Sequence, residues 1–335
     1  MSRSKPALRV VALSALLAGV AVHADEPYVV VDSIPGPDGG YDYASFDDAS
    51  GRLFVAREYG VMAVDVEQRA VTPKLVSGND LSAVLIVPGT PLMLSTNWGG
   101  DTATLFERAT GKIAAEIRTG DGPDAAVFDP LTRRAFVMNS NSGDVTVIDI
   151  ATRGVVGTVP LGGKPEAGVA DGQGRVYVNV EDSATIAVID VASLRVVGRH
   201  ALPGCEEPTG LAYDPASRLL IAACHNRTVK LVDAASGADR GSVVVCSDAD
   251  GALFDDRRHL VYVPCNDGTL TILSLDAAGT AKTIQAVQTR PGARTAAFDP
   301  DSGRVYLPVA TFETDTSGER KLVPGTFAVL VVAPR

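Results

Sequence analysis

The sequence repeats itself seven times with a period of about 42 residues. Each copy is anchored by an apolar or aromatic residue, usually followed by Asp, a turn, Arg and a short β-type run. The anchors are Phe46, Leu85, Phe128, Ala170, Tyr213, Phe254 and Phe298. A period in the forties with four short strands in each unit is typical of propeller blades. The spacing therefore predicts an all-β, seven-bladed β-propeller built from four-stranded antiparallel blades.

The strands of one copy can be placed from alternating Val, Ile, Thr and aromatic residues between turn formers. In the third copy this pattern predicts an inner strand at 125–128 and a second strand at 135–138. A third strand is predicted at 145–150 and an outer strand at 154–159. No part of the chain after residue 24 shows helical periodicity.

The two ends of the repeat region complement each other. After Phe298 the chain supplies second and third strands, at 305–307 and 327–332, but no fourth. A matching outer strand is present at the other end, at about 28–34. Pairing this N-terminal strand into the last blade would close the ring and cover a sheet edge.

Residues 1–24 have the pattern of a cleavable signal peptide. Arg3, Lys5 and Arg9 precede an apolar run of thirteen residues, and Val22-His23-Ala24 resembles a cleavage site. The apolar run is shorter than the roughly 20 residues that a membrane-spanning helix needs. We expect export to the periplasm or beyond, no transmembrane anchor, and one propeller domain over residues 25–335.

The charge of the chain limits its partners. Loss of three basic residues with the leader changes the formal net charge from −10 to −13. This charge makes nucleic acid an improbable partner and favours a small molecule or an envelope protein. We expect a monomer.

The four cysteines fall at equivalent places in two neighbouring copies. Cys205 and Cys224 lie eight before and eleven after Tyr213, and Cys246 and Cys265 lie likewise around Phe254. A hairpin brings each pair together, so an exported chain favours the disulfides Cys205–Cys224 and Cys246–Cys265. Unpaired thiols, or a metal site of four thiols with His225, remain as alternatives, although no C-x-x-C spacing supports a metal.

Three segments of the repeats are distinctive: Gly-Arg-Val-Tyr-Val-Asn at 174–179, Thr-Val-Ile-Asp at 146–149 and Val-Val-Gly-Thr-Val-Pro at 155–160. With these segments the repeats resemble the YVTN-type blades of YncE-like seven-bladed propellers. Longer segments, such as Cys-Glu-Glu-Pro-Thr-Gly at 205–210, resemble an exported bacterial subgroup. The resemblance covers residues 28–335 and implies a periplasmic or secreted propeller, but it supplies no catalytic residues.

One repeat position, four residues before each anchor, gathers charged side chains. We call it the rim position, because inner strands of a propeller begin around the axis, where ligands commonly bind. It holds Asp42, Leu81, Asp124, Glu166, Thr209, Asp250 and Arg294. Carboxylates this close raise one another's pKa or require a cation.

Three interpretations of the rim position remain open. The acids could bind a divalent cation or a small polar ligand, they could form a catalytic site, or they could be a solvated rim that keeps the ring soluble. No cofactor is indicated beyond this possible divalent cation, and the metal's identity is unknown.

Two further side chains are candidates for the same face. Trp98, the only tryptophan, lies in a Thr-Asn-Trp-Gly-Gly loop and could either stack on a ligand or fill space between blades. His225 could act as a base or ligand, or could be a loop histidine whose hydrogen bonds are satisfied within the protein.

The chain carries no Gly-x-Ser-x-Gly, Walker or His-Glu-x-x-His motif. The sequence therefore favours a binding or interaction module that recognises a ligand or cation at the rim. A metal-dependent hydrolase or lyase using the rim carboxylates, and an envelope scaffold for proteins, are the alternatives.

Overall fold

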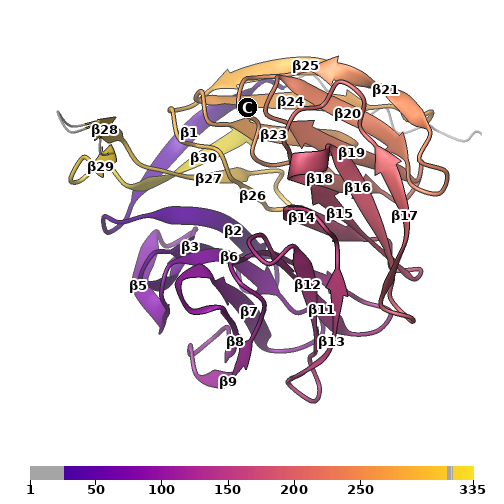
Figure 1. Cartoon of the computed structure of the whole chain (residues 1–335). Helices are drawn as coiled ribbons and strands as arrows, with labels where there is room; N and C mark the ends of the chain where they lie inside the picture. Colours follow the sequence, from indigo (N-terminus) through magenta and orange to yellow (C-terminus); the bar gives the residue numbers. More distant parts are fainter. Residues whose placement is uncertain (1–25, 315–317, 319) are drawn as a thin grey trace, which may run out of the picture.

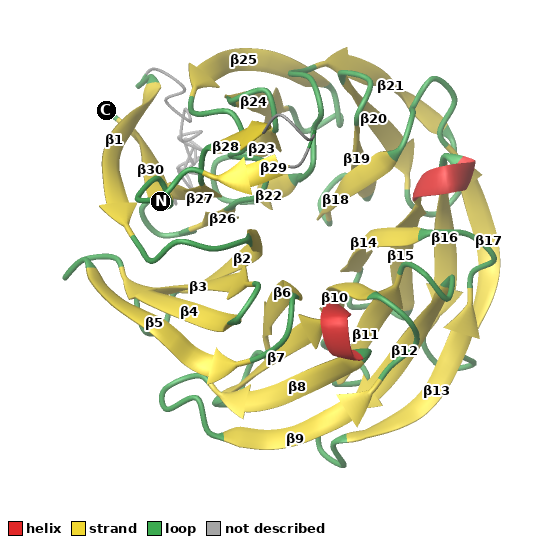
Figure 2. Ribbon diagram, turned by 60° about the vertical axis from the view of Figure 1, so that its left-hand side comes forward, coloured by secondary structure: helices red, strands yellow, loops and turns green. Residues whose placement is uncertain are grey.

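The computed structural model describes residues 26–314, 318 and 320–335, which form a ring of seven four-stranded antiparallel sheets (Figure 2). The sheets are arranged around a central axis, with the first strand of each blade innermost. This confirms the predicted seven-bladed β-propeller. The predicted leader, residues 1–24, lies outside the described residues.

The strands of the blades, from the inner to the outer edge, have the following bounds. Blade 1 contains β2 (Tyr41–Asp47), β3 (Arg52–Arg57), β4 (Gly60–Asp65) and β5 (Ala70–Ser77). Blade 2 contains β6 (Leu81–Ile86), β7 (Leu92–Asn97), β8 (Thr102–Glu107) and β9 (Ile113–Arg118). Blade 3 contains β10 (Pro123–Asp129), β11 (Arg134–Asn139), β12 (Asp144–Asp149) and β13 (Gly154–Pro160). Blade 4 contains β14 (Pro165–Ala170), β15 (Arg175–Val180), β16 (Thr185–Asp190) and β17 (Arg195–Ala201).

The remaining blades follow the same order. Blade 5 contains β18 (Pro208–Asp214), β19 (Leu219–Cys224), β20 (Thr228–Asp233) and β21 (Asp239–Val244). Blade 6 contains β22 (Leu253–Asp255), β23 (Leu260–Cys265), β24 (Thr269–Leu275) and β25 (Ala281–Gln288). Blade 7 contains β26 (Ala297–Phe298), β27 (Val305–Val309), β30 (Ala328–Pro334) and β1 (Tyr28–Pro35). Short 3₁₀ helices follow β7, as η1 (Trp98–Gly100), and β15, as η2 (Glu181–Ser183).

The ring is closed by the N-terminal strand, as predicted. In Figure 1, β1 (indigo) lies beside β30 (yellow), and Tyr28 pairs with Pro334. Gln285 of blade 6 holds the start of β1 across the seam, because its Oε1 accepts from the Tyr28 backbone N–H at 2.9 Å and its Nε2 donates to the Tyr28 carbonyl at 2.7 Å. The side-chain amide thus takes the place of a neighbouring backbone peptide.

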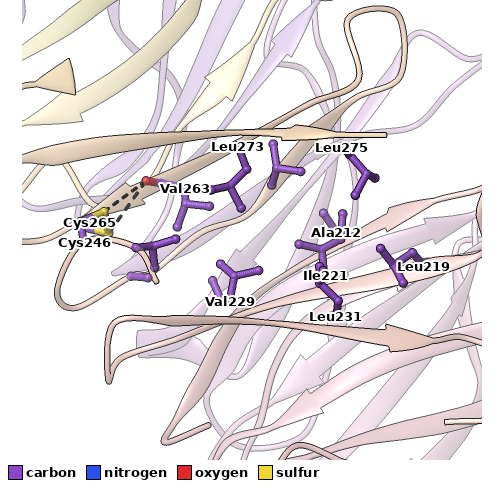
Figure 3. Packing of buried hydrophobic residues seen from close by; sticks show 14 residues of the cluster. Ala212, Leu219, Ile221, Val229, Leu231, Cys246, Val263, Cys265, Leu273 and Leu275 are labelled. Carbon is purple, nitrogen blue, oxygen red and sulfur yellow. Dashed lines mark hydrogen bonds between the residues drawn. A yellow bond between two sulfur atoms is a disulfide. The ribbon is translucent and has the colours of Figure 1, made fainter. Parts of the chain in front are cut away.

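The hydrophobic core lies between adjacent blades. Between blades 5 and 6, Ile221 and Leu231 face Val263 and Leu273, and all four are at most 2% exposed (Figure 3). Similar clusters fill the other junctions, since alternate residues of each strand point to opposite faces of the sheet. Burial of this kind makes each blade depend on its neighbours for stability.

A further pair of strands in blade 7 was not predicted from the sequence. Between β27 and β30 the chain forms an added hairpin of β28 (Phe312–Thr314) and β29 (Arg320–Leu322). It brings Phe312 and Arg320 to the mouth of the channel. The segment is therefore part of the site's surroundings rather than a simple connection.

The inner strands of blades 1 to 5 share a β-bulge near their start. In β10 the pairing with β11 shifts between Pro123 and Ala126, so that Asp124 lies within the bulge. The same shift lies between Tyr41 and Ala44, and between Pro165 and Gly168. A bulge re-aims the side chain that it carries, which places Asp42, Asp124 and Glu166 at the axis.

Candidate functional site

A cavity of about 600 Å³ occupies one end of the channel. We call it the rim cavity. Of the seven residues predicted at the rim position, all but Leu81 line it, and so does His225; the six are Asp42, Asp124, Glu166, Thr209, Asp250 and Arg294. The structure therefore brings these side chains from six blades together.

The register of blade 2 corrects one rim residue. The bulge in β6 lies between Leu81 and Val84, and Ile86 pairs with Met93. In blade 1 the equivalent pairing is Phe46 with Leu53, so the anchor of blade 2 is Ile86 rather than Leu85. Ser82 accordingly occupies the rim position, and its hydroxyl donates a hydrogen bond to the Asp124 carboxylate.

Arg294 is already engaged by two of the acids. Its Nη1 donates to Asp250, and its Nη2 lies 3.2 Å from Asp42 Oδ2. The Asp42 carboxylate raises the pKa of Arg294 above its ordinary value, so the guanidinium stays charged. Both terminal nitrogens are used inside the protein, which leaves Arg294 poorly placed to receive an anionic ligand.

Asp42 and Asp124 hold protons more tightly than ordinary aspartates do. Burial raises the pKa of Asp42 to about 7, against the lowering influence of Arg294, and the Asp250 and Asp124 charges add to the rise. Burial likewise raises the pKa of Asp124, partly offset by the Ser140 hydroxyl that donates to it at 3.1 Å.

Glu166 is the least compensated of these carboxylates. It is 7% exposed, and burial, followed by the charges of Asp124 and Asp250, raises its pKa well above the ordinary value. Within the described residues its only hydrogen bond comes from the Tyr43 hydroxyl, at 3.4 Å. The nearby Lys164 is paired with Glu181. A buried carboxylate with so few partners favours a cation as its ligand.

Several lining residues were missed by the sequence reasoning. Tyr41 and Phe312 form an aromatic wall, with ring centroids 6.4 Å apart, and Arg320 lies over the Phe312 ring at 5.0 Å. The Tyr41 ring is fixed because its hydroxyl donates to the Gly292 carbonyl at 2.8 Å. Tyr43, on the channel floor, could have been noticed as the residue that follows a rim acid.

Thr209 and His225 are both held by local bonds. Thr209 Oγ1 donates to the Ala249 carbonyl at 2.6 Å, tying blade 5 to blade 6. His225 Nδ1 lies 2.8 Å from Glu207 Oε2. Both still border the rim cavity, so each is available as part of its wall.

The two predicted disulfides are present. Cys205 is joined to Cys224 and Cys246 to Cys265, with Cα atoms 5.5 and 5.9 Å apart. Each bond ties the end of a second strand to the segment that leads into the inner strand. They therefore anchor the segments that carry Thr209 and Asp250, and no cysteine is left unpaired among the residues described.

Trp98 does not line the rim cavity. It lies in η1, where its backbone N–H donates to the Asp80 carbonyl at 2.9 Å. Its ring lies close to Gly122, where an added Cβ would approach the indole to 3.2 Å. The tryptophan thus packs at the junction of blades 2 and 3.

The side chains do not form a metal centre. Over residues 26–314, 318 and 320–335, no group of three His, Cys, Asp or Glu side chains is arranged to hold a metal ion. The Arg294 guanidinium already bridges two of the four acids. The described side chains thus do not provide the set of three ligands that the suggested divalent cation would need.

Comparison with known proteins supports the architecture. No protein-family model matches the chain, and no curated protein matches it in sequence. A chain in the "Crystal Structure of Mitotic Checkpoint Complex" matches with a TM-score of 0.76 and 13% identity, over 97% of this chain and 98% of that one. A chain of Kuenenia stuttgartiensis hydrazine synthase matches with a TM-score of 0.69 and 16% identity, over 86% and 97%. These likenesses show the fold alone.

The disulfides bear on the cellular location. Disulfides persist mainly in oxidising compartments, and the two that are present here are compatible with a periplasmic or extracellular protein. In the part of the chain that the structure describes, no helix has the length and apolar character needed to span a membrane.

Proposed function

We propose that this protein is an exported binding module that recognises a small organic cation in the rim cavity. The observation that carries the proposal is the imbalance of charge around Glu166. Arg294 is shared between Asp42 and Asp250, and Lys164 is paired with Glu181. Among the described residues neither Asp124 nor Glu166 forms an ion pair, and the charge of Lys164 acts on both only from a longer distance.

An ammonium group is the ligand chemistry that suits this arrangement. It donates up to three hydrogen bonds, which the unfilled carboxylate oxygens of Glu166 and Asp42 can accept. Asp42 Oδ1 is buried and accepts no hydrogen bond from the described residues. The Tyr41 ring adds a surface that attracts cations, whereas the Phe312 ring is already covered by Arg320.

The resemblance to YncE-like propellers, the signal-peptide pattern of residues 1–24 and the two disulfides support an exported protein. We propose cleavage after Ala24 and a single domain over residues 25–335. N-terminal sequencing of the protein recovered from the periplasm or medium would test this. An uncleaved N-terminus on cytoplasmic protein would contradict it.

The ligand proposal is tested by titrating the protein with n-butylammonium, n-butanol and butyrate, using ligand-observed NMR. We expect saturable binding of the ammonium compound only. Glu166→Gln should weaken that binding by roughly 10- to 100-fold, since a hydrogen bond to a charged group contributes about 1.5–3 kcal/mol. Glu116→Gln, on the exposed outer strand β9, is the matched control.

Two results would contradict the proposal. One is equal binding of butyrate and butylammonium, which would show that the cavity does not select a cation. The other is unchanged affinity in Glu166→Gln, which would place the binding elsewhere on the protein.

A further inference from the structure

Below the rim cavity the channel changes from charged to apolar. The repeat position that follows the rim position is occupied mostly by small residues. Its members are Tyr43, Ala83, Ala125, Ala167, Gly210, Gly251 and Thr295. A cavity of about 190 Å³ lies along the axis beside these small side chains, and most of them line it.

This apolar space continues to the opposite face of the ring. Leu211, Ala252 and Leu253 line both the 190 Å³ cavity and a mouth of about 490 Å³. We call the two together the lower channel. Its mouth is lined mainly by apolar residues. The one charged residue among the described residues that line the mouth is Asp171. Its Oδ1 accepts hydrogen bonds from the backbone N–H groups of Gln173 and Arg175.

Tyr43 separates the two compartments. Among the residues that the structure describes, it alone lines both the rim cavity and the 190 Å³ cavity. Although it belongs to blade 1, it packs against a core cluster of blades 3 and 4 that contains Ala125 and Met138. Its ring therefore crosses the axis. Its hydroxyl bonds Glu166, the same carboxylate that a cation would take.

We propose that the ligand is an amphiphilic organic cation, whose charged group pairs with Glu166 and whose apolar chain enters the lower channel past Tyr43. This inference rests on the proposed function. A cation at Glu166 competes with the Tyr43 hydroxyl for the carboxylate, so binding frees the ring to turn away from the axis. Acids above and an apolar passage below are complementary to a molecule with a charged head and a hydrocarbon tail.

The size of the lower channel agrees with such a tail. An apolar cavity of about 150 Å³ stays dry and admits benzene, and the narrow part of the lower channel alone is about 190 Å³. Burial of each further methylene should tighten binding about fourfold. Affinity should therefore rise with the length of the chain.

The experiment titrates the protein with n-butyl-, n-hexyl- and n-octylammonium, and with the three matching alcohols, below their micelle concentrations. Two variants fill the lower channel, Ala126→Leu and Ala167→Leu, and Ala70→Leu on the exposed outer strand β5 is the control. We expect about fourfold tighter binding per methylene in the wild type and in Ala70→Leu. In the two filled variants the gain with chain length should disappear, while butylammonium still binds within about twofold.

The outcomes separate the two proposals. If butylammonium binds but chain length has no effect, or if the filled variants keep the full gain, the amphiphile inference is overturned and the cation site stands. If the alcohols bind as tightly as the ammonium compounds, the proposed cation function fails. Retained butylammonium binding shows that a filled variant is folded, and either variant suffices for the test.

Discussion

Replacing Arg294 by Gln removes the cation that holds two carboxylates of the rim cavity in place. Arg294 contacts Asp250 and lies 3.2 Å from Asp42, and the three side chains are 35%, 13% and 23% exposed. Breaking a fully buried ion pair costs about 3–5 kcal/mol, whereas exposed pairs contribute about 0–1 kcal/mol. At this intermediate burial we expect Arg294→Gln to lower the free energy of unfolding by about 2–3 kcal/mol at pH 8.

The loss of unfolding free energy caused by Arg294→Gln should be larger at pH 8 than at pH 5. The pKa of Asp42 in the folded protein is about 7, above its unfolded value, so its ionised form opposes folding and its proton favours the folded state. Without Arg294, which lowers it, this pKa rises further. As the pH falls from 8 to 5, the variant takes up the proton and regains stability faster than the wild type. We expect the difference between them to shrink to below about 1 kcal/mol at pH 5.

Urea unfolding followed by the fluorescence of Trp98 measures both quantities. Arg257→Gln is the matched control, because Arg257 pairs with Asp301 on the surface, at 55% and 72% exposure. It should cost less than about 1 kcal/mol at either pH. A cost for Arg294→Gln below 1 kcal/mol at pH 8, or one equally large at both pH values, would refute the electrostatic account of the rim cavity.

Three further predictions concern the seam, the disulfides and the ligand. Gln285→Ala should lower the free energy of unfolding by about 1–3 kcal/mol, because the Tyr28 backbone groups lose their partner. An unchanged urea midpoint would show that the hydrogen bonds between Gln285 and Tyr28 do not stabilise the ring. Replacing Cys246 and Cys265 by Ser should cost about 3 kcal/mol from the loss of the cross-link, measured by urea unfolding against the oxidised wild type. Under reducing conditions, where both disulfides are open in the wild type as well, the same substitution should cost nothing further. Butylammonium affinity should fall as the pH drops from 8 to 5, because Asp42 becomes protonated; equal dissociation constants across this range would show that the acids are not the ligands.

Much of the fold could be predicted because the repeat is regular. The period located the blades, and the unpaired third strand of the last copy identified 28–34 as its partner. Blade 2 was misplaced by one residue, since Leu85, Ile86 and Val87 are all apolar and the alternation does not distinguish the faces of the strand. The β28–β29 hairpin carries no repeat pattern that would place it.

The site could be predicted in position but not in chemistry. Because every blade contributes an equivalent residue, one repeat position identified Asp124, Glu166 and the other acids at the same level. The sequence does not show that Arg294 is bonded to two of those acids, or that Lys164 is paired with Glu181. It also gives no sign that Tyr43 crosses the axis, since this depends on small residues in the facing blades.

The pairing of β1 with β30 has a consequence for the order of folding. Tyr28 and Pro334 are neighbours in one sheet, so the loop between them spans nearly the whole described chain. Contacts this distant in sequence are slow to form. During synthesis, six blades can assemble one after another while β1 is still without its partner strand. The ring therefore closes only when β30 has been synthesised. Until then the unpaired edge of β1 is the part of the molecule most accessible to a chaperone or to a second nascent copy.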